Sequence, residues 1–343
     1  MAMTLATATD VDGKPAMLDG HGRLIDYLRI SVTDRCDLRC RYCMSETMQF
    51  LPRREVLTLE EIAVIAERFI ARGVRKIRLS GGEPLVRRDF GALARALGRH
   101  VHDGTLDELT LTTNGTQLAQ HAGMLVEAGM RRINVSLDSL DPATFAYITR
   151  GGDIEQVLGG ITAAAKAGLK IKINMVALRG LNDAEVLPML QYCDANGHDL
   201  TLIETMPLGQ IDDDRSNRYL PLHEAIMPVR EQYDIAPIND RTGGPARYFS
   251  VSGLKAKLGL ITPLSDNFCA GCNRMRLTCQ GRIYMCLGHE DHIDLKAAFR
   301  EQGIDGIDAL LDRALAAKPK AHDFHVEKGA APATHRHMSV TGG

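Results

Sequence analysis

The feature of this sequence that most constrains the fold is an alternation of strand and helix patterns that repeats six times between residues 24 and 206. Each unit is an apolar, β-branched run, then a loop, then a stretch with helical periodicity. The predicted strands are 24–33, 74–80, 107–112, 131–137, 169–177 and 199–206, and the predicted helices lie near 58–72, 89–99, 116–128, 153–167 and 182–195. Because strands that alternate with helices are joined by crossovers, they form a parallel sheet. Six units fall short of the eight of a closed barrel, so we expect an α/β fold with an incomplete, open (β/α)6 barrel.

The ends of these predicted strands carry polar residues and glycines. In parallel α/β folds the functional groups gather at the C-terminal ends of the strands. We therefore expect a functional site at that edge, built from Thr33-Asp34-Arg35-Cys36, Ser80-Gly81-Gly82-Glu83-Pro84, Thr112-Thr113-Asn114-Gly115, Ser136-Leu137-Asp138-Ser139 and Glu204-Thr205-Met206-Pro207.

The first of these segments leads into Cys36, Cys40 and Cys43, three cysteines within eight residues. A chain of 343 residues that is 45% hydrophobic can bury a sizeable core without a disulfide framework. The clustered thiols therefore indicate metal binding. Three thiolates can hold a four-iron cluster and leave one iron open for chemistry. A zinc loop is the alternative, although a fourth ligand is not evident nearby.

A second set of cysteines lies near the C-terminus, with Cys269 and Cys272 followed after thirteen residues by Cys286. This is again a three-ligand pattern, which a second cluster with its own open iron would suit. Cys279 leaves a four-thiolate zinc or iron site as an alternative. The eighth cysteine, Cys193, falls in a predicted amphipathic helix and is expected to be a small core residue.

The first cysteine loop, with Tyr42 before its last cysteine, resembles the signature of the radical S-adenosylmethionine superfamily. The Gly81-Gly82-Glu83-Pro84 run after the second strand is similar to a second motif of that superfamily. The resemblance implies a [4Fe-4S] cluster on Cys36, Cys40 and Cys43, and S-adenosylmethionine as cosubstrate. It also implies cofactor contacts from Tyr42, Gly82, Glu83, Ser136 and Met206.

From about residue 22 to the end, the chain resembles the radical S-adenosylmethionine family that acts on GTP at the first step of molybdenum cofactor biosynthesis. The supporting segments are 27–36, 76–85, the distal cysteines around Asn273-Arg274-Met275-Arg276, and the terminal Gly342-Gly343. The resemblance implies a second [4Fe-4S] cluster on Cys269, Cys272 and Cys286 that binds guanine, and Thr112 in the GTP site. It implies catalytic roles for the cluster-loop cysteines and for Arg274, Arg276, Gly342 and Gly343. The implied product is (8S)-3′,8-cyclo-7,8-dihydroguanosine 5′-triphosphate.

The placement of basic residues favours a triphosphate ligand independently of the resemblance. Cations at inward positions of a barrel would be poorly placed unless an anion lay between them. Arg274 and Arg276 are two residues apart, so on an extended chain they point to the same side. The predicted phosphate-binding set is Arg29, Lys76, Arg78, Lys172, Arg274 and Arg276. The arginine pairs Arg53/Arg54, Arg87/Arg88 and Arg131/Arg132 receive no function.

We divide the chain into a flexible N-terminal extension (1–21), the barrel (22–207), a C-terminal region for the second cluster and substrate (208–330), and a tail (331–343). In the third part we expect a helix at 221–233, strands at 246–251 and 258–262, and a helix near 294–316. The formal charge of −2 argues against nucleic acid or a membrane surface as partner. No signal peptide or long apolar segment is present, so a cytoplasmic location is expected.

Neither a GxxxxGK[ST] nor a GxGxxG pattern occurs, so a nucleotide would be rearranged rather than used for phosphoryl transfer. The resemblance implies an electron donor, a homodimer, and cyclic pyranopterin monophosphate synthase as the enzyme that takes the product. Two alternatives stay open: another radical S-adenosylmethionine enzyme with an auxiliary cluster, such as a peptide or sulfatase maturase, and a non-catalytic zinc or iron–sulfur protein.

Overall fold

The computed structural model describes residues 8–9, 13, 15–240 and 242–342. One large sheet contains β3 (Tyr27–Ser31), β4 (Lys76–Ser80), β5 (Glu108–Thr113), β6 (Arg132–Ser136), β7 (Lys170–Ala177), β8 (Asp199–Glu204), β9 (Ile235–Ile238), β10 (Arg247–Val251), β11 (Leu258–Ile261), β12 (Arg274–Leu277), β13 (Arg282–Tyr284) and β14 (His292–Asp294). A separate small sheet pairs β1 (Ala8–Thr9) with β2 (Pro15–Ala16).

The α-helices are α1 (Leu59–Ala71), α2 (Phe90–His102), α3 (Leu118–Glu127), α4 (Pro142–Thr149), α5 (Ile154–Lys166), α6 (Val186–Ala195), α7 (Leu222–Ala225), α8 (Met227–Gln232), α9 (Leu295–Gln302), α10 (Asp305–Ala316) and α11 (Met338–Thr341). Short 3-10 helices are η1 (Arg53–Glu55), η2 (Pro84–Val86), η3 (Asp183–Glu185), η4 (Arg215–Asn217) and η5 (Cys269–Gly271). None of the helices in the described part of the chain is long and apolar enough to cross a membrane.

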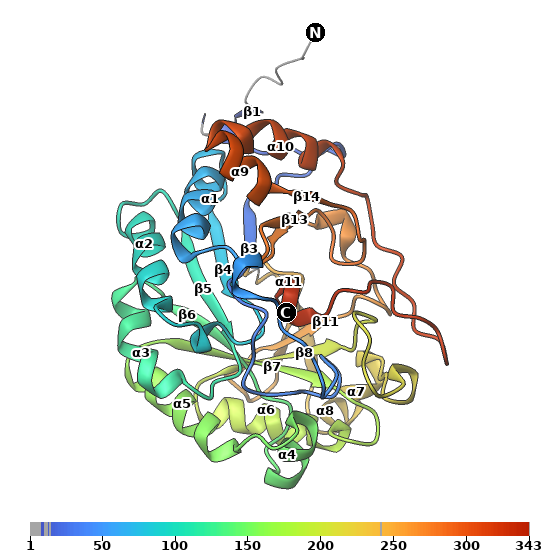
Figure 1. The fold of residues 1–343 in the computed structure, drawn as a ribbon. Helices are drawn as coiled ribbons and strands as arrows, with labels where there is room; N and C mark the ends of the chain where they lie inside the picture. Colours follow the sequence, from blue (N-terminus) through green and yellow to red (C-terminus); the bar gives the residue numbers. More distant parts are fainter. Residues whose placement is uncertain (1–7, 10–12, 14, 241, 343) are drawn as a thin grey trace.

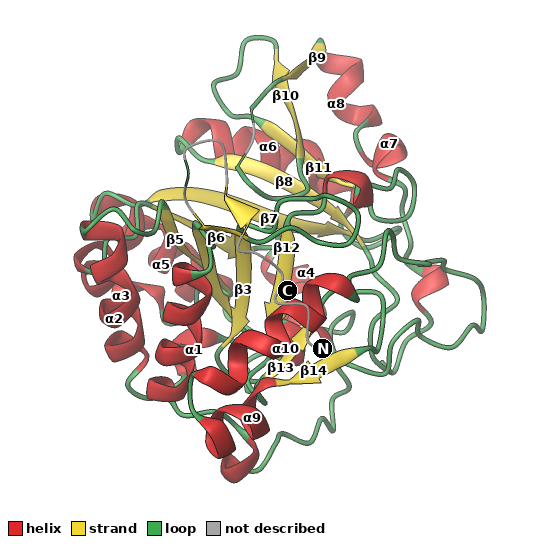
Figure 2. Ribbon diagram, turned by 90° about the horizontal axis from the view of Figure 1, so that it is seen from above, coloured by secondary structure: helices red, strands yellow, loops and turns green. Residues whose placement is uncertain are grey.

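The large sheet has the strand order β14-β13-β12-β3-β4-β5-β6-β7-β8-β11-β10-β9. The eight strands from β12 to β11 run parallel, and antiparallel strands extend the sheet at both edges. The sheet curls around a central space, with α1 to α6 on its outside (Figures 1 and 2). This is the open α/β half-barrel that the sequence predicts.

The six predicted barrel strands are confirmed, as are the five helices between them. Helix α1 begins with a capping box, in which Thr58 and Glu61 exchange hydrogen bonds, and it ends before Gly73 at a φ of 110°. Helix α4 was not predicted, although Asp141 caps it and Pro142 occupies its first turn. The Asp-Pro pair is a helix-start signal that the sequence did contain.

Two predicted helices of the C-terminal region are each divided in the structure. The stretch 221–233 forms α7 and α8, because Pro228 in the first turn of α8 has no N–H to continue the preceding helix. The stretch 294–316 forms α9 and α10, and Gly303 separates them at a φ of 67°. Strands β9, β12, β13 and β14 were not predicted.

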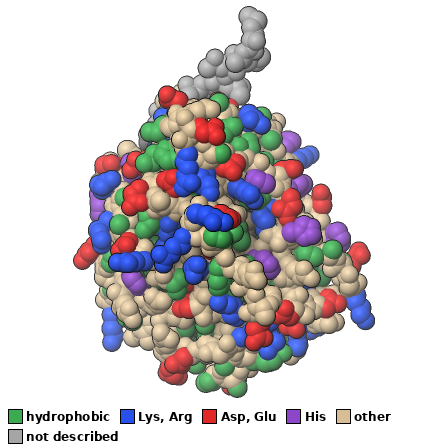
Figure 3. Space-filling view, in the orientation of Figure 1, with side chains coloured by type: hydrophobic (Ala, Val, Ile, Leu, Met, Phe, Trp, Pro, Cys, Tyr) green, Lys and Arg blue, Asp and Glu red, His purple; other side chains and the backbone are tan. Residues whose placement is uncertain are grey.

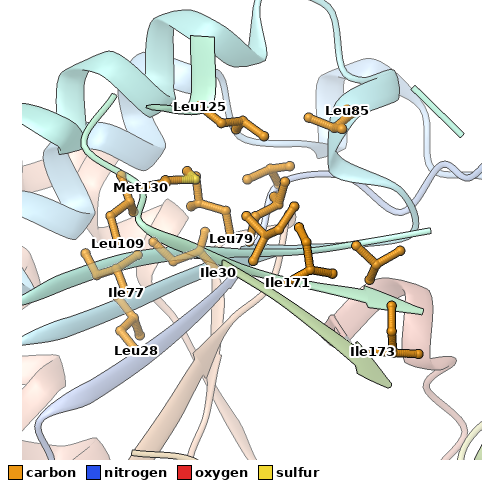
Figure 4. Close-up of a cluster of buried hydrophobic side chains, with 14 of the residues drawn as sticks. Leu28, Ile30, Ile77, Leu79, Leu85, Leu109, Leu125, Met130, Ile171 and Ile173 are labelled. Carbon is orange, nitrogen blue, oxygen red and sulfur yellow. The ribbon is translucent and has the colours of Figure 1, made fainter. Parts of the chain in front are cut away.

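Successive side chains of the barrel strands point to opposite faces of the sheet, so the outer face is apolar and the inner face is polar. Leu28 and Ile30 of β3 are completely buried and point toward the helices, while Arg29 between them faces the central space. Figure 4 shows the same arrangement on the neighbouring strands, with Ile77, Leu79, Leu109, Ile171 and Ile173 packed together with Leu125 of α3. The apolar core therefore lies outside the barrel wall, which leaves the inside free for polar groups.

The C-terminal region forms both walls of the barrel opening. β12 pairs with β3, and β11 pairs with β8, each in parallel. The two edges of the six-strand barrel, which would otherwise carry unpaired backbone groups, are thereby covered. Residues far apart in the sequence, such as Arg29 and Arg276, become direct neighbours in the sheet.

The described part of the N-terminal extension lies against the barrel. Met17 is 1% exposed and belongs to the main core. Its carbonyl accepts a hydrogen bond from Ile25 N at 2.8 Å. The backbone of Pro15 approaches Gly73 so closely that an added Cβ there would lie 2.1 Å from the Pro15 oxygen.

Candidate active site

Two cavities lie on the inner face of the sheet. The first, which we name the cluster-loop cavity, is lined by Cys36, Cys40 and Cys43 together with residues at the ends of β4 to β7. The second, the cation cavity, is lined by Arg29, Arg78, Lys172, Arg274, Arg276 and the distal cysteines. Asn174, Ile203 and Met206 line both cavities, so the two spaces meet at these residues.

The loop after β3 is held in place by backbone contacts with the end of α4. Arg39 N and Arg41 N donate to the carbonyls of Thr149 and Ile148, at 3.1 and 3.0 Å. Arg150 follows α4 with a φ of 56°, and its guanidinium donates to the carbonyls of Arg39 and Met44. These contacts present the three thiols of the loop to one cavity.

The donor set of this loop fits an iron–sulfur cluster. Burial raises the pKa of the Cys36 and Cys40 thiols, and it raises the pKa of Cys43 to about 11. Thiolates at these positions need a positive partner, which iron supplies. Within the described residues, no three Cys, His, Asp or Glu side chains converge on a single ion. Thiolates that hold a cluster each bind a different iron and need not converge.

Tyr42 is oriented by Asp138, a pairing that the sequence did not reveal. Its hydroxyl donates to Asp138 Oδ2 at 2.8 Å, and Val176 N donates to Asp138 Oδ1 at 2.8 Å. Burial raises the pKa of Asp138 to about 6. Both Tyr42 and Asp138 line the cluster-loop cavity. Asp138 stands at a predicted strand end, and that position was its only signal in the sequence.

Gly81 and Gly82 line the cluster-loop cavity and also pack against the cluster loop. An added Cβ on Gly81 would lie 2.3 Å from Thr33 O, and one on Gly82 would lie 2.3 Å from Arg35 O. The glycines are therefore required by the close approach of two backbones.

Glu83 is fully buried and is not among the residues that line the cavity. Its carboxylate accepts from Leu85 N, Thr113 Oγ1 and Asn114 N at 3.0, 2.8 and 2.6 Å. Glu83 thus links the end of β4 to the end of β5 through hydrogen bonds. Its predicted contact with the cofactor stays a prediction.

The other predicted cofactor residues, Ser136 and Met206, line the cluster-loop cavity. Thr112, predicted for GTP, also lines this cavity and not the cation cavity. Because Met206 borders both spaces, the structure places it between the predicted cofactor site and the predicted substrate site.

Cys269, Cys272 and Cys286 all line the cation cavity. Burial opposes the thiolate form of Cys272, but Arg274 and Lys318 outweigh it and lower the pKa of this thiol to about 7. Lys318 was not predicted. It is 3% exposed, and its ammonium donates to Arg274 O at 2.9 Å, to Met285 O at 2.6 Å and to Cys272 Sγ at 3.6 Å. The lysine therefore ties together the segments that carry the distal cysteines.

Cys279 lies apart from these three thiols. It is completely buried and is not among the residues that line the cation cavity. Its neighbours are the charged groups of Asp34 and Arg87 and the hydroxyl of Ser31. The position of Cys279 speaks against a four-thiolate site formed with Cys269, Cys272 and Cys286.

Three arginines stand side by side on adjacent strands of the cation cavity. Arg276 of β12 is in register with Arg29 of β3, and Arg29 is in register with Arg78 of β4. Burial first, and then the charges of Arg276 and Arg78, lower the pKa of Arg29. A guanidinium nevertheless stays protonated, so an anion in the cavity would relieve this repulsion. Arg274, also predicted, faces the same cavity.

Lys172 and Lys76, both predicted to bind phosphate, lie in different places. Lys172 lines the cation cavity, and its ammonium donates to Tyr248 Oη at 2.8 Å. Burial, with Arg78 and Arg132 nearby, lowers the pKa of Lys172 well below its usual value. Lys76 lies two residues before Arg78 on β4, and it is in register with Glu108 of β5. It lines a recess at the N-terminal end of the barrel and not the cation cavity.

The C-terminal tail enters the barrel, where it lines the cluster-loop cavity and contacts Arg276 of the cation cavity. Helix α11 lies inside the curve of the sheet, and Met338 lines the cluster-loop cavity (Figure 1). Gly342 O accepts a hydrogen bond from Arg276 Nη1 at 3.2 Å. An added Cβ on Gly342 would lie 2.1 Å from Ser80 Oγ. Gly343, predicted to be catalytic with Gly342, lies outside the described residues.

Charge on the outer surface is mixed. On the face drawn in Figure 3, Lys and Arg side chains are frequent at the centre and left, with Asp and Glu among them, and histidines gather at the right. The concentrated positive charge of the described residues is inside the molecule, on the cation cavity.

Two family models match consecutive parts of the chain. Residues 30–193 match the radical SAM superfamily, and residues 198–324 match Molybdenum Cofactor Synthesis C. The computed structure is similar in fold to crystal structures of Streptococcus suis SuiB. One of these, bound to S-adenosylmethionine, gives a TM-score of 0.61 at 16% identity over 93% of this chain and 78% of that one. Another gives 0.60 at 15% identity over 87% of this chain and 67% of that one.

The half-barrel, the cysteine loop at its first strand and the family match define a radical S-adenosylmethionine enzyme. Curated relatives narrow this class. A protein of Erythrobacter litoralis named GTP 3′,8-cyclase is 55% identical over 95% of this chain and 98% of its own length. One of Agrobacterium fabrum with the same name is 53% identical over 98% of this chain and 97% of its own length. The chain belongs to the GTP 3′,8-cyclase family.

Proposed function

We propose that this protein converts GTP to (8S)-3′,8-cyclo-7,8-dihydroguanosine 5′-triphosphate, the first step of molybdenum cofactor biosynthesis. The observation that carries the proposal is the pair of adjoining cavities, each with three cysteines, one of them walled by buried cations. A radical made in the cluster-loop cavity would reach a substrate in the cation cavity across the residues that line both.

The cluster-loop cavity would hold a [4Fe-4S] cluster on its three cysteines, with S-adenosylmethionine against the Gly81-Gly82 backbone, Ser136 and Met206. When bound, this pair supplies the 5′-deoxyadenosyl radical. Tyr42, anchored on Asp138, would keep one wall of the cofactor space in position. Glu83 would not touch the cofactor but would hold the turn that presents the two glycines.

The cation cavity would hold GTP and the second [4Fe-4S] cluster, on Cys269, Cys272 and Cys286. Arg29, Arg78, Arg274, Arg276 and Lys172 would bind the triphosphate, and the cluster would face guanine. Lys76 keeps a proposed role in phosphate binding from the recess at the N-terminal end. Gly342, bonded to Arg276, would place the end of the chain beside the substrate. Thr112 would approach the substrate from the other cavity.

The reaction needs a hydrogen atom to leave C3′ of the ribose and the carbon radical to add to C8 of guanine; a further electron and proton then complete the product. The described residues would bring C3′ to the shared border and exclude water from it. Lys172 near Tyr248 and the buried arginines would hold the triphosphate, so the ribose could turn only within narrow limits.

The decisive experiment is anaerobic reconstitution with iron and sulfide, followed by dithionite, S-adenosylmethionine and GTP. We expect 5′-deoxyadenosine to form only when GTP is present, together with the cyclised nucleotide. Formation that depends on a peptide instead of GTP would favour a maturase. A protein that binds zinc and makes no 5′-deoxyadenosine would favour a non-catalytic role.

The number of clusters is tested by metal content. The reconstituted protein should bind about eight irons, since each cysteine triplet would hold a four-iron cluster. Replacing Cys269, Cys272 and Cys286 by alanine should halve the iron while leaving the first cluster in place. An unchanged iron count in this variant would contradict the second site.

The remaining partners follow from family membership. We propose an external one-electron donor, transfer of the product to cyclic pyranopterin monophosphate synthase, a homodimer, and a cytoplasmic location. Light scattering during size-exclusion chromatography tests the dimer, and a monomer at micromolar concentration would contradict it.

A further inference from the structure

A buried amide at the border of the two cavities has no role in the assignments above. Asn134 of β6 is 1% exposed and lines the cation cavity. Its Nδ2 donates to Asn174 Oδ1 of β7 at 3.4 Å. Its Oδ1 has no hydrogen-bond partner among the residues that the structure describes. Buried acceptors without a partner are uncommon, and one on a cavity wall points to a ligand that supplies the donor.

The register of the sheet places this amide between a residue of the cation cavity and a residue of the cluster-loop cavity. Asn134 is opposite Lys172 of β7 on one side and Thr112 of β5 on the other. Its partner Asn174 is opposite Ser136 and lines both cavities. The pair therefore stands where the wall changes from cationic groups to the groups of the cluster-loop cavity.

The two amides together offer an acceptor oxygen and N–H donors toward the shared space. With Asn134 Nδ2 bonded to Asn174 Oδ1, Asn134 Oδ1 is left to accept and Asn174 Nδ2 is left to donate. If both amides were turned over, the roles would exchange, but the pair would still present an acceptor oxygen on one residue and N–H donors on the other. A neutral acceptor is unsuited to phosphate, whereas a vicinal diol, which donates and accepts, matches it.

We propose that Asn134, held by Asn174, binds the ribose hydroxyls of the nucleotide and so sets which sugar carbon faces the cluster-loop cavity. In GTP the ribose is the neutral part between triphosphate and base. With the triphosphate on the arginines, it is the part that reaches the border. This inference rests on the proposed placement of GTP in the cation cavity, and it makes Asn134 a substrate-binding residue and Asn174 its positioning residue.

The test compares the binding of GTP, 2′-deoxy-GTP and 3′-deoxy-GTP to the reconstituted protein without reductant, by calorimetry, so that no turnover occurs. The wild type should bind at least one deoxy nucleotide about tenfold more weakly than GTP, the value of one well-made hydrogen bond. In Asn134→Ala this ratio should fall to about one, because GTP weakens while that analogue does not.

Controls separate the inference from folding and from the proposed function. Thr201→Val removes a buried hydroxyl opposite Asn174 on β8, from a side chain that lines neither cavity, and it should keep the wild-type ratio. If Asn134→Ala does not fold, Asn134→Val keeps a β-branched residue on the strand and serves in its place. A wild-type ratio in the folded Asn134 variant, or no discrimination in the wild type, overturns the inference. A wild type that does not bind GTP at all overturns the proposed placement of GTP instead.

Discussion

At the scale of single residues, several side chains perform a different task from the one that their motif suggests. Gly81 and Gly82 are needed because the backbone of the cluster loop passes within 2.3 Å of where their Cβ atoms would be. Glu83 turns its carboxylate away from the cavity and toward the backbone of the next strand end. The Gly81-Gly82-Glu83 segment therefore holds the cluster loop and the end of β5 together, in addition to any role in binding.

Glu83 should make stability depend on pH. Burial raises the pKa of this carboxyl from 4.5 to about 7. A group whose folded pKa is raised contributes stability that is present below its unfolded pKa and is lost as the pH rises through the folded value. Between pH 5 and pH 8 the metal-free protein should lose on the order of 3 kcal/mol relative to Glu83→Gln, which cannot ionise.

Urea denaturation of the wild type and of Glu83→Gln at both pH values measures this difference. Exposed Glu155→Gln is the control, and its difference from the wild type should not change with pH. A difference between the wild type and Glu83→Gln that stays constant from pH 5 to pH 8 would sink the prediction.

Lys318 should matter for the distal cysteines. Lys318→Met would leave the buried carbonyls of Arg274 and Met285 without their donor, at a cost of roughly 1–3 kcal/mol each. We expect a lower melting temperature and a loss of up to half of the bound iron after reconstitution. Lys320→Met, exposed and two residues further, is the matched control. Full iron content in Lys318→Met would show that the lysine is dispensable.

At the scale of elements, the tail acts through a short helix inserted into the barrel. Ser31 Oγ donates to Ser339 O at 3.4 Å, and Ala333 N donates to Pro207 O at 2.8 Å. Gly342 then passes Ser80 and reaches Arg276. The tail is therefore placed by contacts along its length, and its last residues are placed by the lack of a side chain at Gly342.

Gly342→Ala should displace the end of the tail without disturbing the clusters. The new methyl group would meet Ser80, and the φ of 76° disfavours alanine as well. Product formation should fall by roughly 100-fold, the scale expected when a group beside the substrate moves by about 1 Å. Iron content should be unchanged.

Gly329→Ala separates strain from contact. Gly329 also has a positive φ, of 72°, but no atom lies within 4 Å of its added Cβ. This variant should retain nearly full activity. Equal losses in the two variants would mean that backbone strain at a positive φ, and not the contact at Ser80, is responsible.

At the scale of the whole molecule, the C-terminal region is part of the barrel wall. It adds β12 beside β3 and β11 beside β8, so the parallel sheet has eight strands although the first part of the chain supplies only six. The same region brings the distal cysteines and Arg274 to the inner face. Substrate cavity and barrel edge are thus built by the same residues.

A fragment of residues 22–207 should not be a stable monomer. It would expose both the β3 and β8 edges, which in the full chain are paired. We expect aggregation during size-exclusion chromatography, whereas the full chain elutes as a single species. A monomeric fragment with a cooperative thermal transition would contradict this reading of the sheet.

The sequence by itself determined what depends on neighbours along the chain. Apolar periodicity marked all six barrel strands and their helices, and cysteine spacing marked both thiol triplets. Only the tertiary structure decided which strands cover the barrel edges. Only it showed that Lys318 ties together the segments of the distal cysteines and that Asp138 anchors Tyr42. Only it showed that Lys76 lies outside the cation cavity and that Cys279 lies apart from the distal thiols. The physical reason is that these contacts join residues tens to hundreds of positions apart, and no local pattern records such a pairing.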